Sequence, residues 1–112
     1  METIILILKN PVVLISFIIM ILFKLFPPKN INSWYGYRTN NSKKTKSKWD
    51  FAQKYSATLS LKLLLPLLII QILIYNFYGS TMVIDLSTTA CWLFSLAIVI
   101  SKTEKKLKEI NN

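Results

Sequence analysis

Residues 56–78 read SATLSLKLLLPLLIIQILIYNFY, an apolar run whose one charged side chain is Lys62. A helix needs roughly 20 residues to cross about 30 Å of hydrocarbon, and this run is long enough. A similar run covers about 82–101, and a third covers about 4–26 with an interruption at 9–11. We expect these runs to be three transmembrane helices, so the sequence predicts an all-α membrane protein.

The composition separates apolar and charged residues into blocks. Of 112 residues 53% are hydrophobic, yet 14 Lys and Arg stand against 5 Asp and Glu, which gives a formal net charge of +9. Mean hydropathy is +0.43 although 17% of the residues are charged. A soluble domain would spread its charges over its surface. The pattern therefore favours a small, single-domain integral membrane protein over a soluble, basic nucleic-acid binder.

The scarcity of three residue types excludes several chemistries. The chain has 0 His, 1 Cys and 2 Gly. These counts exclude imidazole-based catalysis, an intrachain disulfide, a cysteine-cluster metal site and a glycine-rich phosphate loop. We therefore expect no enzyme activity, no cofactor and no metal.

The basic residues between the apolar runs predict the orientation of the chain. The loop 27–48 and the tail 102–112 are rich in Lys, whereas 76–85 has neither Lys nor Arg. Because basic loops remain on the cytoplasmic side, we expect the N-terminus outside, the C-terminus in the cytoplasm and a multi-pass protein of the cell membrane. The positive charge is then a topology signal. Nucleic acid is not an expected partner, while anionic lipids at the cytoplasmic face are.

The second helix is expected to begin before it enters the membrane. Ser47 and Asp50 have the spacing of a capping box, with Asp in place of the usual Glu, so the sequence predicts a helix over about 47–78. Such a helix is about 48 Å long, more than the hydrocarbon requires, and its first turns should form a cytoplasmic extension. One face of this extension carries Trp49, Ala52, Gln53 and Ser56.

Polar residues elsewhere in the predicted helices have structural explanations. Asp85 stands near the start of the third helix, where we expect an N-cap rather than an ion-coupling group inside the membrane. Gln71 is expected to bond to a neighbouring helix. The tail 102–112 is expected to be a solvated helix extension in which Glu104 and Lys108 pair at i,i+4.

The segment 30–39, NINSWYGYRT, holds three aromatic residues, a glycine and Arg38, the only arginine of the chain. A lone Arg beside Tyr37 points to a planar, bidentate or stacked contact that Lys would not make. The alternative is an interfacial aromatic belt with Arg38 on a lipid phosphate. Both interpretations place this segment at the membrane surface.

A Pro-containing turn, an Asn, a Gly-Tyr-Arg-Thr core and a Trp-x-x-Ala pair follow one another in this region. The residues concerned are Asn32, Gly36, Tyr37, Arg38, Thr39, Trp49 and Ala52. In this order and spacing they resemble the SdpI family of small bacterial integral membrane proteins, an immunity-protein family. The chain departs from the family pattern at Asn40, where members often have Pro, and at Gln53, where they often have Asn.

The resemblance implies a function. The namesake of the family protects a producer cell against its own secreted peptide toxin and, as a membrane receptor, sequesters a cytoplasmic repressor when toxin is bound. By resemblance we expect a membrane immunity or receptor-type protein, with a peptide toxin and a cytoplasmic repressor as partners. The alternatives are a holin-like pore former and a small transporter or scaffold subunit. A bundle this thin also leads us to expect a homo-oligomer.

Two roles stay open for the motif residues. As a structural clasp, Gly36 permits a tight turn, and Asn32 and Thr39 satisfy backbone groups of the loop. As a ligand site, the loop holds Arg38 ready for a carboxylate, a lipid phosphate or the carbonyls of a helix C-terminus. In both roles Trp49 is expected to help fold the loop back against the helix ends.

Overall fold

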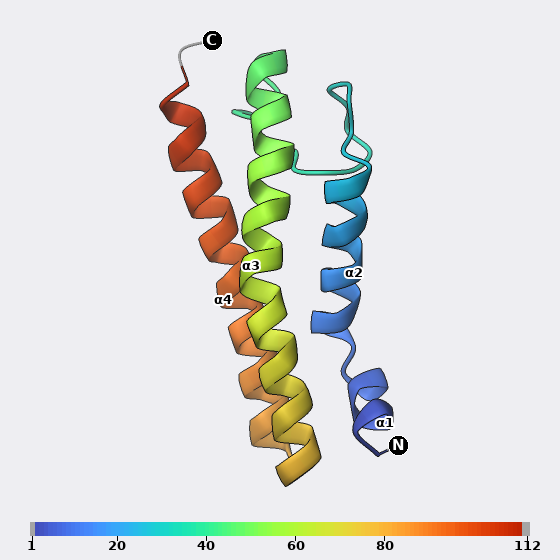
Figure 1. Ribbon diagram of the computed structural model, residues 1–112. Helices are drawn as coiled ribbons and strands as arrows, with labels where there is room; N and C mark the ends of the chain where they lie inside the picture. The colour runs from blue at the N-terminus through green and yellow to red at the C-terminus, as the bar shows by residue number, and fades with distance from the viewer. Residues whose placement is uncertain (1, 111–112) are drawn as a thin grey trace.

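The computed structural model describes residues 2–110 and contains four α-helices in that range. They are α1 (Glu2–Lys9), α2 (Val12–Leu25), α3 (Lys46–Tyr78) and α4 (Met82–Lys108). α3 lies between α2 and α4 in a bundle 50 Å long (Figure 1). The loop 26–45 shares one end of the bundle with the C-terminal end of α4, while α1 and the α3–α4 turn lie at the other. The all-helical prediction is confirmed; residues 111–112 of the predicted tail lie outside the described residues.

The helices α3 and α4 are each long and apolar enough to cross a membrane, but the first apolar run is not a single helix. Its two helices meet at a bend of 79°, so the expectation of one continuous helix over 4–26 is wrong. Pro11 has no amide hydrogen and its ring clashes with a preceding helical carbonyl, so α1 ends at Lys9 and α2 begins at Val12. α2 alone is about 21 Å long, so this run crosses a bilayer only if the bent pair counts as one span.

Side chains of α3 hold the break between α1 and α2. Gln71 Nε2 donates to the Asn10 carbonyl over 3.2 Å, and Asn10 Nδ2 donates to the Tyr75 hydroxyl over 3.3 Å. Gln71 and Tyr75 are both buried. The predicted bond from Gln71 to a neighbour is therefore confirmed, although its partner is the link between two helices rather than a helix.

Asp85 does not cap α4. Thr81 is the N-cap, and its hydroxyl accepts the Ile84 amide hydrogen over 3.1 Å. Asp85 lies in the first turn, where its two oxygens accept from the hydroxyls of Tyr75 and Ser80, each over 2.7 Å. Thr81 has the extended backbone that an N-cap requires, whereas Asp85 already lies within the helix.

Thr45, and not Ser47, caps α3. Thr45 has an extended backbone, and its hydroxyl accepts the Lys48 amide hydrogen over 3.1 Å. Asp50 forms an ion pair with Lys46, four residues before it, instead of completing a capping box. The helix consequently begins at Lys46, a residue earlier than predicted.

The interfaces between the helices combine small and polar side chains with a few large apolar ones. The buried positions of α3 recur every three or four residues and are Trp49, Ala52, Gln53, Ser56, Ala57, Ser60, Leu64, Leu68, Gln71 and Tyr75. Those of α4 are Thr88, Ser95, Val99, Thr103 and Leu107. Small side chains let helix backbones approach closely, which is the usual way that helices pack inside a membrane. Many large apolar side chains of α3 and α4 point outward instead.

Candidate functional site

The indole of Trp49 anchors the loop 26–45 to the first turn of α3. Its side chain is fully buried, and its Nε1 donates to the Pro28 carbonyl over 2.8 Å. Ala52 follows one turn later on the same face and is also fully buried. The predicted folding of the loop against a helix end is confirmed by these contacts.

Gln53 pairs with the backbone of Tyr37 as a neighbouring strand would. Its Oε1 accepts the Tyr37 amide hydrogen over 2.7 Å, and its Nε2 donates to the Tyr37 carbonyl over 2.6 Å. Gln53 is only 4% exposed, so both bonds are shielded from competing solvent. One side chain thereby satisfies both backbone groups of a loop residue.

Gly36 is required for this pairing. Its φ of +93° belongs to the left-handed region, where a side chain is strained. A Cβ built on Gly36 would lie 2.7 Å from Pro28 Cγ and still closer to Gln53 Oε1. The glycine therefore serves both the backbone turn and the close approach of Gln53.

Glu104 of α4 binds the same loop from the other side. Its Oε2 accepts from the hydroxyls of Tyr37 and Thr39 over 2.7 and 2.8 Å, and its Oε1 accepts from Asn41 Nδ2 over 2.9 Å. We call these contacts of Tyr37, Thr39 and Asn41 with Gln53 and Glu104 the clasp. Sequence reasoning missed Glu104 because its spacing from a lysine four residues on already supplied an explanation.

The expected helical extension of the tail is confirmed, since α4 continues to Lys108, but the extension is not solvated on every face. Thr103 and Leu107, on either side of Glu104, are fully buried. The signal for Glu104 was present in the sequence: it is an acid beyond the apolar run, and the predicted topology places it on the same side as the polar loop.

The electrostatics of the clasp keep Glu104 ionised and Tyr37 protonated. Burial raises the pKa of Glu104, but the hydrogen bonds from Tyr37, Thr39 and Asn41 and the charge of Lys108 outweigh it, and the pKa is lowered. Burial and the Glu104 carboxylate together raise the pKa of the Tyr37 hydroxyl. The clasp bonds to Glu104 are thus charge-assisted at neutral pH, and such bonds are roughly twice as strong as neutral ones.

Hydrogen bonds within the loop also stabilise its conformation. Ser42 is fully buried; its hydroxyl accepts the Thr39 amide hydrogen and donates to the Thr39 carbonyl, each over 2.8 Å. Asn32 Oδ1 accepts the amide hydrogens of Trp34 and Tyr35 over 2.8 and 3.1 Å. Asn32 therefore satisfies backbone groups of the loop, as predicted. Thr39 does so as well, because its hydroxyl accepts the Ser42 amide hydrogen over 3.2 Å.

The loop, α3 and most of α4 are also the part of the chain that matches known proteins. A model of the SdpI/YfhL protein family matches residues 29–101. The chain belongs to this family. The uncharacterized protein YfhL of Bacillus subtilis (strain 168) is 59% identical over 39 residues, which are 35% of this chain and 36% of that relative. The match spans about a third of the relative's length, and no solved structure matches the chain.

Most residues that carry the SdpI/YfhL resemblance lie together at the clasp end of α3. Those in or beside the clasp are Gly36, Tyr37, Thr39, Trp49 and Ala52. The departure from the family pattern at Gln53 lies in the same place, where this side chain reaches both backbone groups of Tyr37. Asn32 and Arg38 stand apart, since both bond within the loop and are not part of the clasp.

Arg38 is exposed, and its Nη1 donates to the Ser33 carbonyl over 2.6 Å. Among residues 2–110 it has no carboxylate partner, and it does not reach the carbonyls of a helix C-terminus. Trp34, in the same loop, is 87% exposed. The loop therefore presents a guanidinium and an indole outward, while Tyr37, Thr39 and Asn41 bind inward to Glu104.

A cavity of about 130 Å³ lies under the loop, between the helices. Gly36 and the clasp residues Tyr37 and Gln53 form part of its wall, and Ser60 and Leu96 lie deeper. Its lining is mostly apolar, which suits an apolar group better than an ion. Within the described range no cluster of Cys, Asp and Glu side chains is placed to hold a metal ion.

Proposed function

We propose that this chain is a multi-pass protein of the bacterial cell membrane that protects its own cell against a secreted peptide toxin and catalyses no reaction. Membership of the SdpI/YfhL family and the two long apolar helices support this. The observation that carries the proposal is the clasp, since most residues of the family resemblance lie in it or beside it. A receptor gains affinity from such a preorganised surface, because little ordering remains to be done on binding.

The proposed topology has three spans, with the bent α1–α2 pair as the first. The N-terminus is outside, and the loop 26–45 and the C-terminus are cytoplasmic. Two facts support this: the loop and the C-terminal end of α4 share one end of the bundle, and both are rich in Lys (Figure 1).

Single cysteines placed at the two ends of the bundle test the orientation. In a Cys91→Ala background, a membrane-impermeant thiol reagent on intact cells should label Ser80→Cys in the α3–α4 turn and leave Lys44→Cys in the loop unlabelled. Permeabilised cells should show labelling at both positions, which controls for access to the thiols. The reverse pattern on intact cells would overturn the orientation.

We also propose that the clasp passes toxin contact on to a cytoplasmic repressor. Gln53 on α3 and Glu104 on α4 bind the same loop, so a relative movement of these two helices must change the bonds that hold it. The test is whether a tagged repressor moves to the membrane when toxin is added. Glu104→Gln should weaken this recruitment, whereas Glu109→Gln, also near the end of α4 but outside the clasp, should not.

Protection itself is tested in toxin-sensitive cells that express the full chain. They should survive doses of a secreted antibacterial peptide that kill cells carrying an empty vector. Arg38→Ala should weaken protection, and Lys44→Ala is the matched control because it removes an equal charge from an exposed position of the same loop.

Each unfavourable outcome has its own meaning. A chain that is present in the membrane but gives no protection contradicts the immunity proposal. Equal protection by Arg38→Ala contradicts the role of Arg38 alone. A collapse of membrane potential on expression without toxin would identify a holin-like pore instead.

A further inference from the structure

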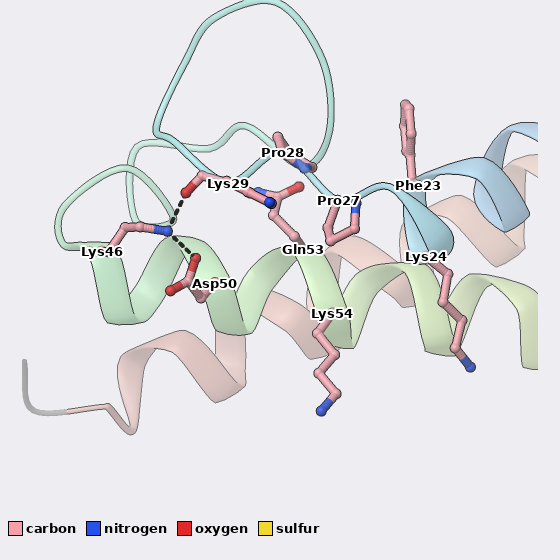
Figure 2. A pocket seen from close by; sticks show the side chains of 9 residues that line it. All are labelled: Phe23, Lys24, Pro27, Pro28, Lys29, Lys46, Asp50, Gln53 and Lys54. Carbon is pink, nitrogen blue, oxygen red and sulfur yellow. Dashed lines mark hydrogen bonds and ion pairs between the residues drawn. The ribbon is translucent and has the colours of Figure 1, made fainter.

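A pocket of about 500 Å³ opens between the end of α2 and the first turns of α3 (Figure 2). This size is within the range of roughly 300–1,000 Å³ that is usual for small-molecule sites. The charged residues of its lining are Lys24, Lys29, Lys46, Lys54 and Asp50. The pocket is separate from the smaller cavity under the loop, although Phe23 and Gln53 contribute to both.

The charges of this pocket are unbalanced. Asp50, the only acid in the lining, is already paired with Lys46, which also donates to the Lys29 carbonyl. No carboxylate within residues 2–110 forms an ion pair with Lys24, Lys29 or Lys54. Figure 2 shows Lys24 from α2 and Lys54 from α3 extending to the same side of the two helices. Both ammonium groups would attract an anion placed at this rim.

The rest of the lining is apolar and continues onto the surface of α2. Phe23, Pro27 and Pro28 form this part of the wall. Ile19 lies one helical turn before Phe23 on the same face and is 39% exposed. The site therefore combines a basic rim at the helix ends with an apolar track along a helix, which is the chemistry of an amphiphile rather than of a free ion.

We propose that this pocket binds one anionic phospholipid, with its phosphate between Lys24 and Lys54 and an acyl chain along Phe23 and Ile19. The bound lipid would fill the gap between the end of α2 and α3 and so help to fix the angle between these helices. This is a defined site, distinct from the general attraction of basic loops to an anionic membrane surface. It does not depend on the proposed protection against a toxin.

The test is lipid retention by the purified full chain. The protein in a mild neutral detergent is titrated with phosphatidylglycerol or phosphatidylcholine, and native mass spectrometry counts the lipids that stay bound. We expect one phosphatidylglycerol at low lipid concentration and no comparable binding of phosphatidylcholine. Lys24→Gln with Lys54→Gln should weaken the binding about 25-fold, since each lysine near an anionic lipid contributes about fivefold.

Two variants guard against false conclusions. Lys102→Gln with Lys105→Gln removes the same charge from exposed positions of the tail and should bind as the wild type does. Lys24→Arg with Lys54→Arg keeps the charge and should retain most of the binding, which separates loss of the site from loss of the fold.

Three results would overturn the proposal. Equal weakening by the pocket pair and the tail pair would show general charge attraction only. Equal retention of phosphatidylcholine would show that the site does not select lipids with a net negative charge. Competition by inorganic phosphate as effective as that by phosphatidylglycerol would show an anion site without a role for the lipid chains.

Discussion

Gly36→Ala should break the clasp, whereas Gly79→Ala should leave it intact. Both glycines have positive φ, +93° and +74°, so alanine is strained at either position. Only Gly36 has close neighbours: its new Cβ would lie 2.7 Å from Pro28 Cγ, while at Gly79 nothing lies within 4 Å. The pair of variants therefore separates the backbone cost from the cost of disrupting the clasp.

The expected difference follows from the bonds that the new methyl group would displace. Backbone strain of this kind costs about 1–3 kcal/mol and applies to both variants. At Gly36 the methyl also pushes Gln53 away from Tyr37, and the two hydrogen bonds lost are worth roughly 0.5–1.5 kcal/mol each. The free energy of unfolding of Gly36→Ala should consequently fall by about 1–3 kcal/mol more than that of Gly79→Ala.

The assay is unfolding of the purified chain in neutral detergent titrated with dodecyl sulfate, followed by tryptophan fluorescence. Trp49 is fully buried and bonded to the loop, so its emission should report on loss of the clasp. A second measurement, in a double variant, tests whether the extra cost comes from the bonds between Gln53 and Tyr37. In a Gln53→Ala background the two bonds to Tyr37 are already absent, and Gly36→Ala should cost about 1–3 kcal/mol less there than in the wild type. Equal costs for the two glycine variants, or additive costs with Gln53→Ala, would refute the reasoning.

Three further predictions concern the ends of the bundle. Because its pKa is lowered in the folded chain, the Glu104 carboxylate stabilises the fold above its unfolded pKa and loses this effect as pH falls through its folded pKa. Acid should therefore destabilise the wild type more than Glu104→Gln when unfolding is followed from about pH 7 to about pH 3. Thr45→Ala should cost about 1 kcal/mol in unfolding free energy because the Lys48 amide loses its acceptor, while Thr45→Ser should cost less than half of that. Asp85→Ala should cost about 1–3 kcal/mol because the Tyr75 hydroxyl hydrogen loses its acceptor, and Asp85→Asn, which keeps an acceptor, should be closer to the wild type in the same titration.

The sequence predicts whichever features depend on periodicity along one helix. The apolar run 56–78 and the face shared by Trp49, Ala52 and Gln53 both appear as expected, because a 3.6-residue period and hydrophobicity act locally. The helix caps were missed for a local reason. Ser and Thr are similar caps, and only the backbone conformation selects Thr45.

Contacts between segments that are distant in sequence could not be predicted in this way. Glu104 binds Tyr37 across 67 positions of sequence, and no spacing rule connects them. Pro11 is visible in the sequence, but the bend at this proline depends on whether nearby groups can satisfy the carbonyls that have lost a helical partner. Gln71 does so for Asn10 from another helix.

The contacts of the motif bear on whether it is a clasp or a ligand site. Tyr37, Thr39 and Gly36 are occupied with Gln53 and Glu104, so they have little left with which to hold a ligand. Arg38 is exposed and bonds only to a carbonyl of its own loop, which fixes it without consuming its remaining donors. We infer that the clasp is the scaffold and Arg38 the group it presents.

The two parts of this inference separate experimentally. Arg38→Ala should leave the dodecyl sulfate unfolding curve unchanged and weaken protection against the toxin. Gly36→Ala should shift the unfolding curve and weaken protection as well. If Arg38→Ala destabilises the chain as much as Gly36→Ala does, then Arg38 belongs to the scaffold, because a group that only faces a ligand contributes nothing to folding in the ligand's absence.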